Sequence, residues 1–267
     1  MSLRNYHTHT WRCQHARGTE EQYVRTAIAQ GFDTLGFADH TPWPYRSDYV
    51  SDMRMRLDQF DDYKRTVLSL REKYQGRIHI PLGLECEAFP EYFSWLRDFK
   101  AEHLDYIILG NHYDYSDERD HTRLYPAGGF YFGRCTMSDA VIRYGERTLA
   151  GMATGLYDYL AHPDLFLHTM TDFNPDCRAV SRDICQAAKA LHIPLEFNLL
   201  GLARHAQEDQ SQLGYPCPDF WRIAADTGCD AIIGFDAHDP RALTQMDLYA
   251  RARAFLEGLG MSIVDRI

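Results

Sequence analysis

Residues 4–10 read Arg-Asn-Tyr-His-Thr-His-Thr, a short run of strand character that ends in two histidines two residues apart. In an extended chain, residues two apart point to the same side, so His7 and His9 can present two imidazole rings to one ion. Taken alone, such a pair is as typical of solvated or core histidines as of a metal site. Further residues of the chain are needed to distinguish a metal site from solvated or core histidines.

Apolar runs of strand length recur along the chain, and each is followed by a longer segment with helical patterning. The candidate strands are Arg4–His9, Thr34–Ala38, Ile78–Glu85, Tyr106–Gly110, Gly155–Ala161, Pro194–Asn198, Ala231–Phe235 and Met261–Val264. The candidate helices are Thr19–Gln30, Leu57–Tyr74, Glu91–Glu102, Ser138–Ala153, Cys177–Leu191, Pro218–Thr227 and Leu243–Leu259. This alternation predicts an α/β fold, a barrel of seven or eight βα units. No linker divides the chain, so we expect one domain over residues 1–267.

The composition is that of an ordinary globular protein. The chain has 267 residues, of which 45% are hydrophobic and 25% charged, enough to bury a sizeable core. No run approaches the roughly 18 apolar residues of a membrane span, and no signal segment opens the sequence, so we expect a cytoplasmic protein without a membrane partner. The formal net charge of −10 argues against long nucleic acids as partners. It does not exclude an anionic substrate, because bound cations would reverse the local field.

The seven cysteines show no CxxC pair and no regular spacing. We therefore expect buried, reduced thiols, and neither a disulfide framework nor a cysteine-type zinc site.

Potential metal ligands follow nearly every candidate strand. They are His7, His9 and His15 after the first strand, Asp39 and His40 after the second, Glu85 at the end of the third, His112 after the fourth, His162 after the fifth, Glu196 and Asn198 in the sixth, and Asp236 and His238 after the seventh. The C-terminal ends of the strands of a parallel barrel meet on one face, where active sites lie. Unrelated core or surface histidines have no reason to choose that face each time, so the regularity predicts a metal site.

The ligand types indicate which ions such a site would hold. Histidine and carboxylate ligands without thiolates suit zinc, iron or manganese better than calcium or magnesium. A catalytic zinc ion takes about three protein ligands, so the nine strongest candidates point to two or three divalent ions. A site of this kind with a bridging hydroxide is suited to phosphate-ester hydrolysis.

At these residues the sequence resembles the PHP (polymerase and histidinol phosphatase) family. The motifs HTH with His15, ADH, GLE, GNH, AHP and FDAH follow in family order from residue 7 to residue 238. The resemblance implies a distorted (β/α)7 TIM-like barrel and, in most members, three ions. It implies that the first ion is held by His7, His9, Glu85 and Asp236, the second by Glu85, His112 and His162, and the third by His15, His40 and His238. The length and the motif LEFN at residues 195–198 further resemble the histidinol-phosphate phosphatase branch.

One departure from that branch concerns phosphate binding. The branch implies an arginine a few residues past His162, but residues 163–168 contain none, and His168 is the candidate substitute. Arg204 matches the position of a second phosphate-binding arginine, whose planar fork suits phosphate oxygens. Further candidates lie in a loop, where solvated charges are the favoured alternative: Arg119, Arg123 and Arg134.

Other polar and aromatic residues leave alternatives open. Asp39 is expected to orient His40 or another ligand, and is also a candidate for substrate binding. The cluster Trp43-Pro44-Tyr45 either stacks on a substrate ring or packs its loop. The segments His40–Arg56 and Tyr113–Met137 are either surface loops or lids over the substrate. Among the remaining histidines, structural roles are expected for His79, His103 and His192, and substrate contacts stay open for His121 and His205.

These observations predict a metal-dependent phosphoesterase that hydrolyses a small phosphate monoester, with L-histidinol phosphate as the best single candidate. A metal-bridging hydroxide over Glu85 would attack phosphorus, and Asp236 or His238 would pass a proton to the leaving alkoxide. The alternatives are a phosphodiester or nucleotide hydrolase with the same metal site, and a non-catalytic metal-binding module.

Overall fold

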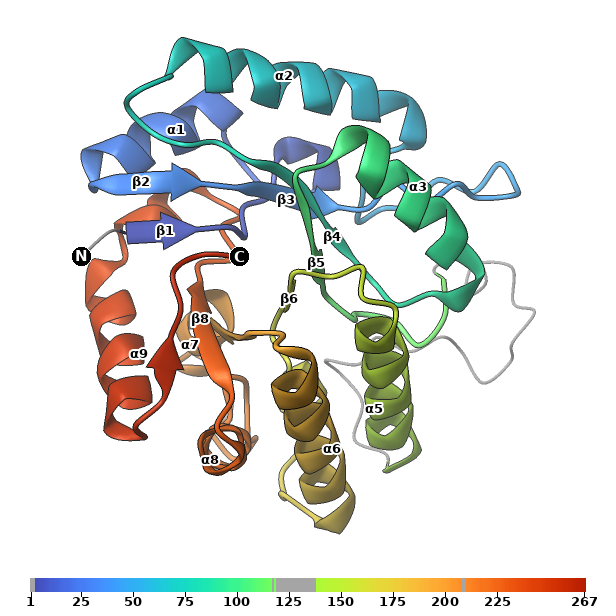
Figure 1. Ribbon diagram of the computed structural model, residues 1–267, viewed down its shortest axis with the longest axis vertical. Coiled ribbons are helices and arrows are strands. Elements are labelled where there is room, and N and C mark those ends of the chain that lie inside the picture. The colour runs from blue at the N-terminus through green and yellow to red at the C-terminus, as the bar shows by residue number, and fades with distance from the viewer. Residues whose placement is uncertain (1–2, 117, 119–137, 208–209) are drawn as a thin grey trace.

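Parallel strands form the centre of the molecule, and helices surround them (Figure 1). The computed structural model describes residues 3–116, 118, 138–207 and 210–267. In this part of the chain, β1 pairs with β2, and the strands from β3 to β9 pair in sequence order, all in parallel. The strands are β1 (Leu3–Asn5), β2 (Phe32–Leu35), β3 (Phe37–His40), β4 (Leu82–Cys86), β5 (Tyr106–Leu109), β6 (Tyr159–Leu160), β7 (Leu195–Asn198), β8 (Asp230–Gly234) and β9 (Ser262–Ile263).

The segment that follows β1 closes these strands into a ring. On one side, Gly36 N donates to Asn5 O over 2.7 Å and Ala38 N donates to Thr8 O over 2.9 Å. On the other side, Thr8 forms a parallel bridge with Ala237, just beyond β8. The predicted α/β fold and its distorted barrel are confirmed.

The first strand is shorter than expected, because Asn5 ends it. The side chain of Asn5 donates to His7 O over 3.0 Å and accepts from Phe235 N over 3.0 Å, in place of regular ladder bonds. The expected strand Thr34–Ala38 is divided into β2 and β3 at Gly36. Each of the other expected strands is present in its predicted place, although several are shorter.

Helices cover the outside of the ring, as Figure 1 shows for α1, α2 and α3 over the first strands. They are α1 (Glu20–Ala29), α2 (Phe60–Lys73), α3 (Phe93–His103), α5 (Ser138–Ala153), α6 (Pro175–Leu191), α7 (Leu199–His205), α8 (Pro218–Thr227) and α9 (Met246–Gly258). Short 3-10 turns are η1 (Trp11–Cys13), η2 (Leu57–Gln59), η3 (Pro90–Tyr92), η5 (Leu165–Leu167) and η6 (Pro240–Thr244). Cap residues set several boundaries: Thr19 and Gln22 form a capping box on α1, and Asn174 caps α6 ahead of Pro175.

Helix α7 is an element that the sequence analysis does not predict. It begins directly after β7, where the Asn198 side chain accepts a hydrogen bond from Gly201 N over 2.8 Å. A Cβ on Gly201 would lie 2.3 Å from the ring of Tyr215, so only glycine allows this close approach. As a result, Arg204 is carried on a helix beside the C-terminal ends of the strands.

An aromatic cluster fills the ring below the strand ends. Tyr6, Tyr106 and Tyr159 are buried there together with Ile108 and Ile232, and the Tyr106 hydroxyl donates to Tyr6 O over 2.6 Å. This packed floor separates the C-terminal ends of the strands from the opposite end of the ring.

Among the described residues, no helix is long and apolar enough to cross a membrane. Six cysteines are buried free thiols, as expected, and Cys135 lies outside the described residues.

Candidate active site

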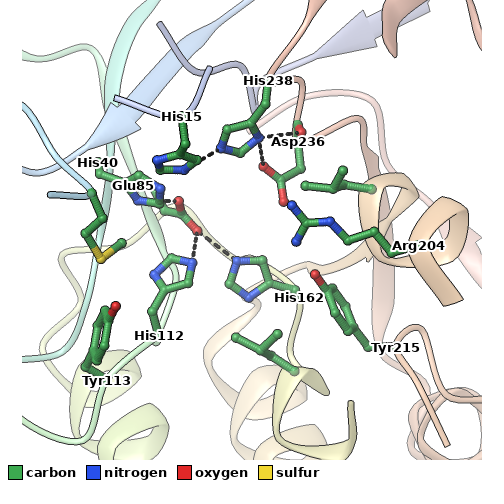
Figure 2. A pocket seen from close by; sticks show the side chains of 13 residues that line it. His15, His40, Glu85, His112, Tyr113, His162, Arg204, Tyr215, Asp236 and His238 are labelled. Atoms are coloured by element: carbon green, nitrogen blue, oxygen red, sulfur yellow. Dashed lines mark hydrogen bonds and ion pairs between the residues drawn. The ribbon is translucent and has the colours of Figure 1, made fainter. Parts of the chain in front are cut away.

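The strand ends surround a cavity of about 210 Å³ (Figure 2). The residues that line it are His15, His40, Met53, Glu85, His112, Tyr113, His162, Leu165, Leu200, Arg204, Tyr215, Asp236 and His238. Seven of the nine predicted metal ligands are therefore in its wall. The other two, His7 and His9, are fully buried behind it.

Four of the predicted ligands converge on one point. His7 Nε2 lies 3.4 Å from Glu85 Oε2 and 3.5 Å from Asp236 Oδ1. His9 Nε2 lies 3.5 Å and 3.2 Å from the same two oxygens. Within the described part of the chain, none of these four atoms has a hydrogen-bond partner. Their spacing fits ligands placed about 2.1 Å from a common centre, for which tetrahedral geometry gives about 3.4 Å between neighbours. The four residues therefore fit a divalent metal ion.

Glu85 also faces a second pair of ligands. Its Oε1 atom lies 2.8 Å from His162 Nε2 and 3.5 Å from His112 Nε2, as the dashed lines in Figure 2 show. Glu85 thus turns one oxygen to each group, which is how a bridging carboxylate would be placed. Gly110 makes room for it, because a Cβ there would lie 2.0 Å from Glu85 Oε1.

The third predicted group lies at the upper edge of the cavity in Figure 2. His15 Nε2 and His238 Nε2 lie 3.0 Å apart, and His238 Nδ1 lies 3.3 Å from Asp236 Oδ1. His40 is close to both, but it turns Nδ1 toward Glu85 Oε2 at 3.0 Å. The structure therefore brings all nine predicted ligands into one continuous cluster.

The electrostatics of the cluster favour cations at its centre. Burial lowers the pKa of His9, but Asp236, Asp39 and Glu85 outweigh it and raise this pKa to about 9. By contrast, burial and the neighbouring rings of His238 and His9 lower the pKa of His15 to about 4. A proton is thus stabilised on His9, which is fully buried among carboxylates, and not on His15.

The backbone at two ligands adopts the left-handed region that favours glycine. His162 has φ 28° and Asp236 has φ 48°. Such conformations cost energy in non-glycine residues and persist where the surroundings enforce them. Two hydrogen bonds hold the backbone of His162 in this conformation: its N donates to Glu196 Oε2 over 3.2 Å, and its O accepts from the Tyr144 hydroxyl over 3.1 Å.

Comparison with known proteins agrees with this geometry. A family model for the PHP domain matches residues 5–200. This chain belongs to the PHP domain family. The protein named "Probable histidinol-phosphatase" of Deinococcus radiodurans is 30% identical over an alignment of 250 residues that covers 88% of this chain and 85% of that protein. The "Histidinol-phosphatase" of Bacillus subtilis is 28% identical over 120 residues, 42% of this chain and 45% of that protein.

A solved structure shares the fold. It is the histidinol phosphate phosphatase of Lactococcus lactis subsp. lactis, in complex with zinc, L-histidinol and phosphate. It is 19% identical, covers 98% of this chain and 95% of its own, and superposes with a TM-score of 0.72. The resemblance expected from the motifs is confirmed.

The three predicted substrate contacts of this PHP chain fall in different places. Arg204 lines the cavity and points toward Asp236 in Figure 2. His168 is not in the cavity wall; its ring lies edge-on to Tyr215, with centroids 5.2 Å apart, and Tyr215 is in the wall. Asp39 requires a correction, because it is fully buried, away from the cavity. Its Oδ2 accepts from Thr10 N over 3.2 Å, and its Oδ1 accepts from the backbone N of His40 over 2.9 Å. The ligand ring that it faces is that of His9, with 3.5 Å between Oδ1 and His9 Nδ1.

The loop between β3 and α2 contributes to the wall of the cavity. Trp43 is buried, stacks on Tyr92 with centroids 5.1 Å apart, and is not in the cavity wall, so its cluster packs the loop. Gln14 Nε2 donates to the backbone oxygens of Ser51 and Arg54 over 2.7 and 3.1 Å. The loop contributes Met53 to the cavity.

Several predicted residues lie elsewhere. Of the loop at 113–137, only residues 113–116 and 118 are described, so predictions for Arg119, His121, Arg123 and Arg134 lie outside the described residues. The remaining histidines are not among the residues that line the cavity: His79, His103, His192 and His205.

Two buried carboxylates lie behind ligand rings in a role that the sequence analysis does not assign: Glu196, which it names only as a potential metal ligand, and Glu87, which it does not name. Glu196 Oε1 lies 2.8 Å from His7 Nδ1, and Glu87 Oε1 lies 3.3 Å from His112 Nδ1. Both are fully buried. Each stands in an apolar stretch of the sequence, where an acidic residue needs a partner, and this signal could have marked them.

Proposed function

We propose that this PHP protein is a metal-dependent phosphatase that hydrolyses a small phosphate monoester. The observation that carries the proposal is the convergence of His7, His9, Glu85 and Asp236 on one point beside a cavity with Arg204 in its wall. Two relatives named histidinol-phosphatase, and a solved relative that holds L-histidinol and phosphate, make L-histidinol phosphate the first substrate to test.

The cluster is large enough for more than one ion. We propose two or three ions of zinc, iron or manganese, with Glu85 between the first and second. The first would be held by His7, His9, Glu85 and Asp236, the second by Glu85, His112 and His162, and the third by His15, His40 and His238. Bound divalent ions supply a water that ionises near neutral pH and positive charge beside phosphate oxygens.

The chain's own side chains would bind and orient the substrate. The guanidinium of Arg204 offers a planar pair of donors to phosphate oxygens. Met53 and Tyr215 contribute apolar and aromatic surface to the cavity wall, which limits the water around the reacting group. Asp236 and His238 line the cavity, and one of them, or a water on a bound ion, would pass a proton to the leaving alkoxide.

Phosphate release from L-histidinol phosphate tests the proposal. Protein stripped with a chelator should be inactive, and zinc or manganese should restore release. A diester such as bis(4-nitrophenyl) phosphate should be turned over more slowly than a monoester. Preference for the diester would favour a phosphodiesterase, and metal-replete protein inactive on a broad panel of phosphate esters would favour a non-catalytic module. The cytoplasmic location, the single domain and the lack of a nucleic-acid partner stay predictions.

A further inference from the structure

Behind His112 lies a buried ion pair that contributes no ligand to the metal cluster. Glu87 and Arg54 are 0% and 1% exposed. Arg54 Nη2 donates to Glu87 Oε1 over 2.8 Å, and Nη1 donates to Oε2 over 3.1 Å. Both guanidinium nitrogens thus meet both carboxylate oxygens, which is the strongest geometry for such a pair.

The same carboxylate faces a candidate metal ligand. Glu87 Oε1 lies 3.3 Å from His112 Nδ1, and the other ring nitrogen, Nε2, lies 3.5 Å from Glu85 Oε1. An acceptor behind Nδ1 favours the tautomer with the proton on Nδ1, which leaves the lone pair on Nε2. That lone pair is then directed to the side where Glu85 lies, as a metal ligand requires.

Two side chains hold the Glu87 carboxylate in place. Arg54 donates to both of its oxygens, so the carboxylate is fixed with Oε1 beside His112 Nδ1. Trp43 Nε1 also donates to Glu87 Oε2, over 3.1 Å.

We infer that Glu87, held by Arg54, is a positioning residue that fixes the ring and tautomer of His112 for metal binding. The inference rests on the proposed metal site and adds a role for residues outside it. Arg54 directly follows Met53 in the loop between β3 and α2, and it also donates to Thr41 O over 3.2 Å. The ion pair therefore joins a wall of the cavity to the ion that His112 would hold.

Zinc occupancy at defined free zinc concentrations tests the inference. The variant His112→Gln first identifies the ion whose binding depends on His112. Glu87→Gln should weaken that same ion by about 10- to 100-fold and leave the other ions unchanged. Glu87→Asp, which keeps the negative charge for Arg54, should recover part of the loss. A matched control is Asp158→Asn, which changes a carboxylate paired with Lys100 just before β6, at the opposite end of the strands, and should leave occupancy unchanged.

A second variant separates positioning from folding. Replacing both partners, Arg54→Met with Glu87→Met, leaves no unpaired buried charge, so the metal-free protein should unfold at a temperature close to that of the wild type. His112 Nδ1 still loses its acceptor, and the same ion should again bind 10- to 100-fold more weakly, by the rule for such outer partners.

Wild-type occupancy in either Glu87→Gln or the double variant overturns the inference. So does a loss of all ions together, or a failure of both variants to fold without metal, because either result marks a general structural role. If His112→Gln itself binds every ion normally, the proposed metal site is wrong and the inference falls with it.

Discussion

Adding a divalent metal to metal-free protein at pH 7 is expected to release protons, because the ion must displace protons that the ligands hold. His9 gives the magnitude. Burial lowers its pKa, but the surrounding carboxylates raise it to about 9, so at pH 7 about 99% of this ring carries a proton. Displacing that proton costs roughly 3 kcal/mol at pH 7. Metal affinity should therefore rise about tenfold per pH unit between pH 7 and 9 from this proton alone.

Calorimetric titration in buffers of different ionisation enthalpy counts the protons released. The pKa values of His7 and His162 are also raised, against burial, by Glu196 and Glu85 respectively and by the other nearby carboxylates, so the total should exceed one. His9→Gln should lower the count by about one. His15→Gln should leave it unchanged, because the pKa of His15 is about 4 and this ring is neutral at pH 7. Metal uptake without proton release, or an affinity independent of pH between 7 and 9, would refute the reasoning.

Three substitutions test other parts of the site. Gly110→Ala places a Cβ 2.0 Å from Glu85 Oε1, so it should displace that carboxylate, cost about 1–3 kcal/mol in thermal unfolding and weaken metal binding. Glu196→Gln weakens the 2.8 Å contact with His7 Nδ1, and metal affinity measured by occupancy should fall about 10- to 100-fold. Arg204→Lys keeps the charge but loses the planar fork, so KM for the phosphate monoester should rise about tenfold while kcat changes little.

Gly258→Ala is the control for Gly110→Ala. A Cβ at Gly258 would meet no atom within 4 Å, so the unfolding temperature of Gly258→Ala should not fall. Unaltered metal occupancy in Glu196→Gln would mean that the partner of His7 does not orient it. If Arg204→Lys leaves KM unchanged, the phosphate is bound elsewhere in the cavity.

The fold could be predicted from the sequence because its signals are local. Strand runs alternate with helical patterns, and the polar residue that ends each run must lie on the same face of a parallel barrel. This reasoning places His7, Glu85 and His162 together although they are far apart in the chain, and the structure brings them to one cluster. It does not require any knowledge of side-chain packing.

Features that depend on contacts between distant segments could not be predicted in the same way. Asn5 ends β1 early because Phe235 N reaches its side chain from the far end of the chain. The sequence leaves open whether Asp39 orients His40 or another ligand; in the structure it accepts from the backbone N of His40, and the ring that it faces is that of His9 from the adjacent segment. The partner of Glu87 is Arg54, which reaches it from a loop 33 residues earlier in the chain.

The outer carboxylates explain how the cluster could exist before metal arrives. Two ligand rings turn Nε2 to the cluster and have a carboxylate oxygen within hydrogen-bond distance of Nδ1, which selects the tautomer that binds metal. The pairs are His7 with Glu196 at 2.8 Å and His112 with Glu87 at 3.3 Å. Buried carboxylates need positive charge, which in the metal-free protein comes from protons on His7 and His9. Divalent ions can replace those protons without moving the rings, so we expect the site to be organised for exchange of protons for metal and not to assemble around it.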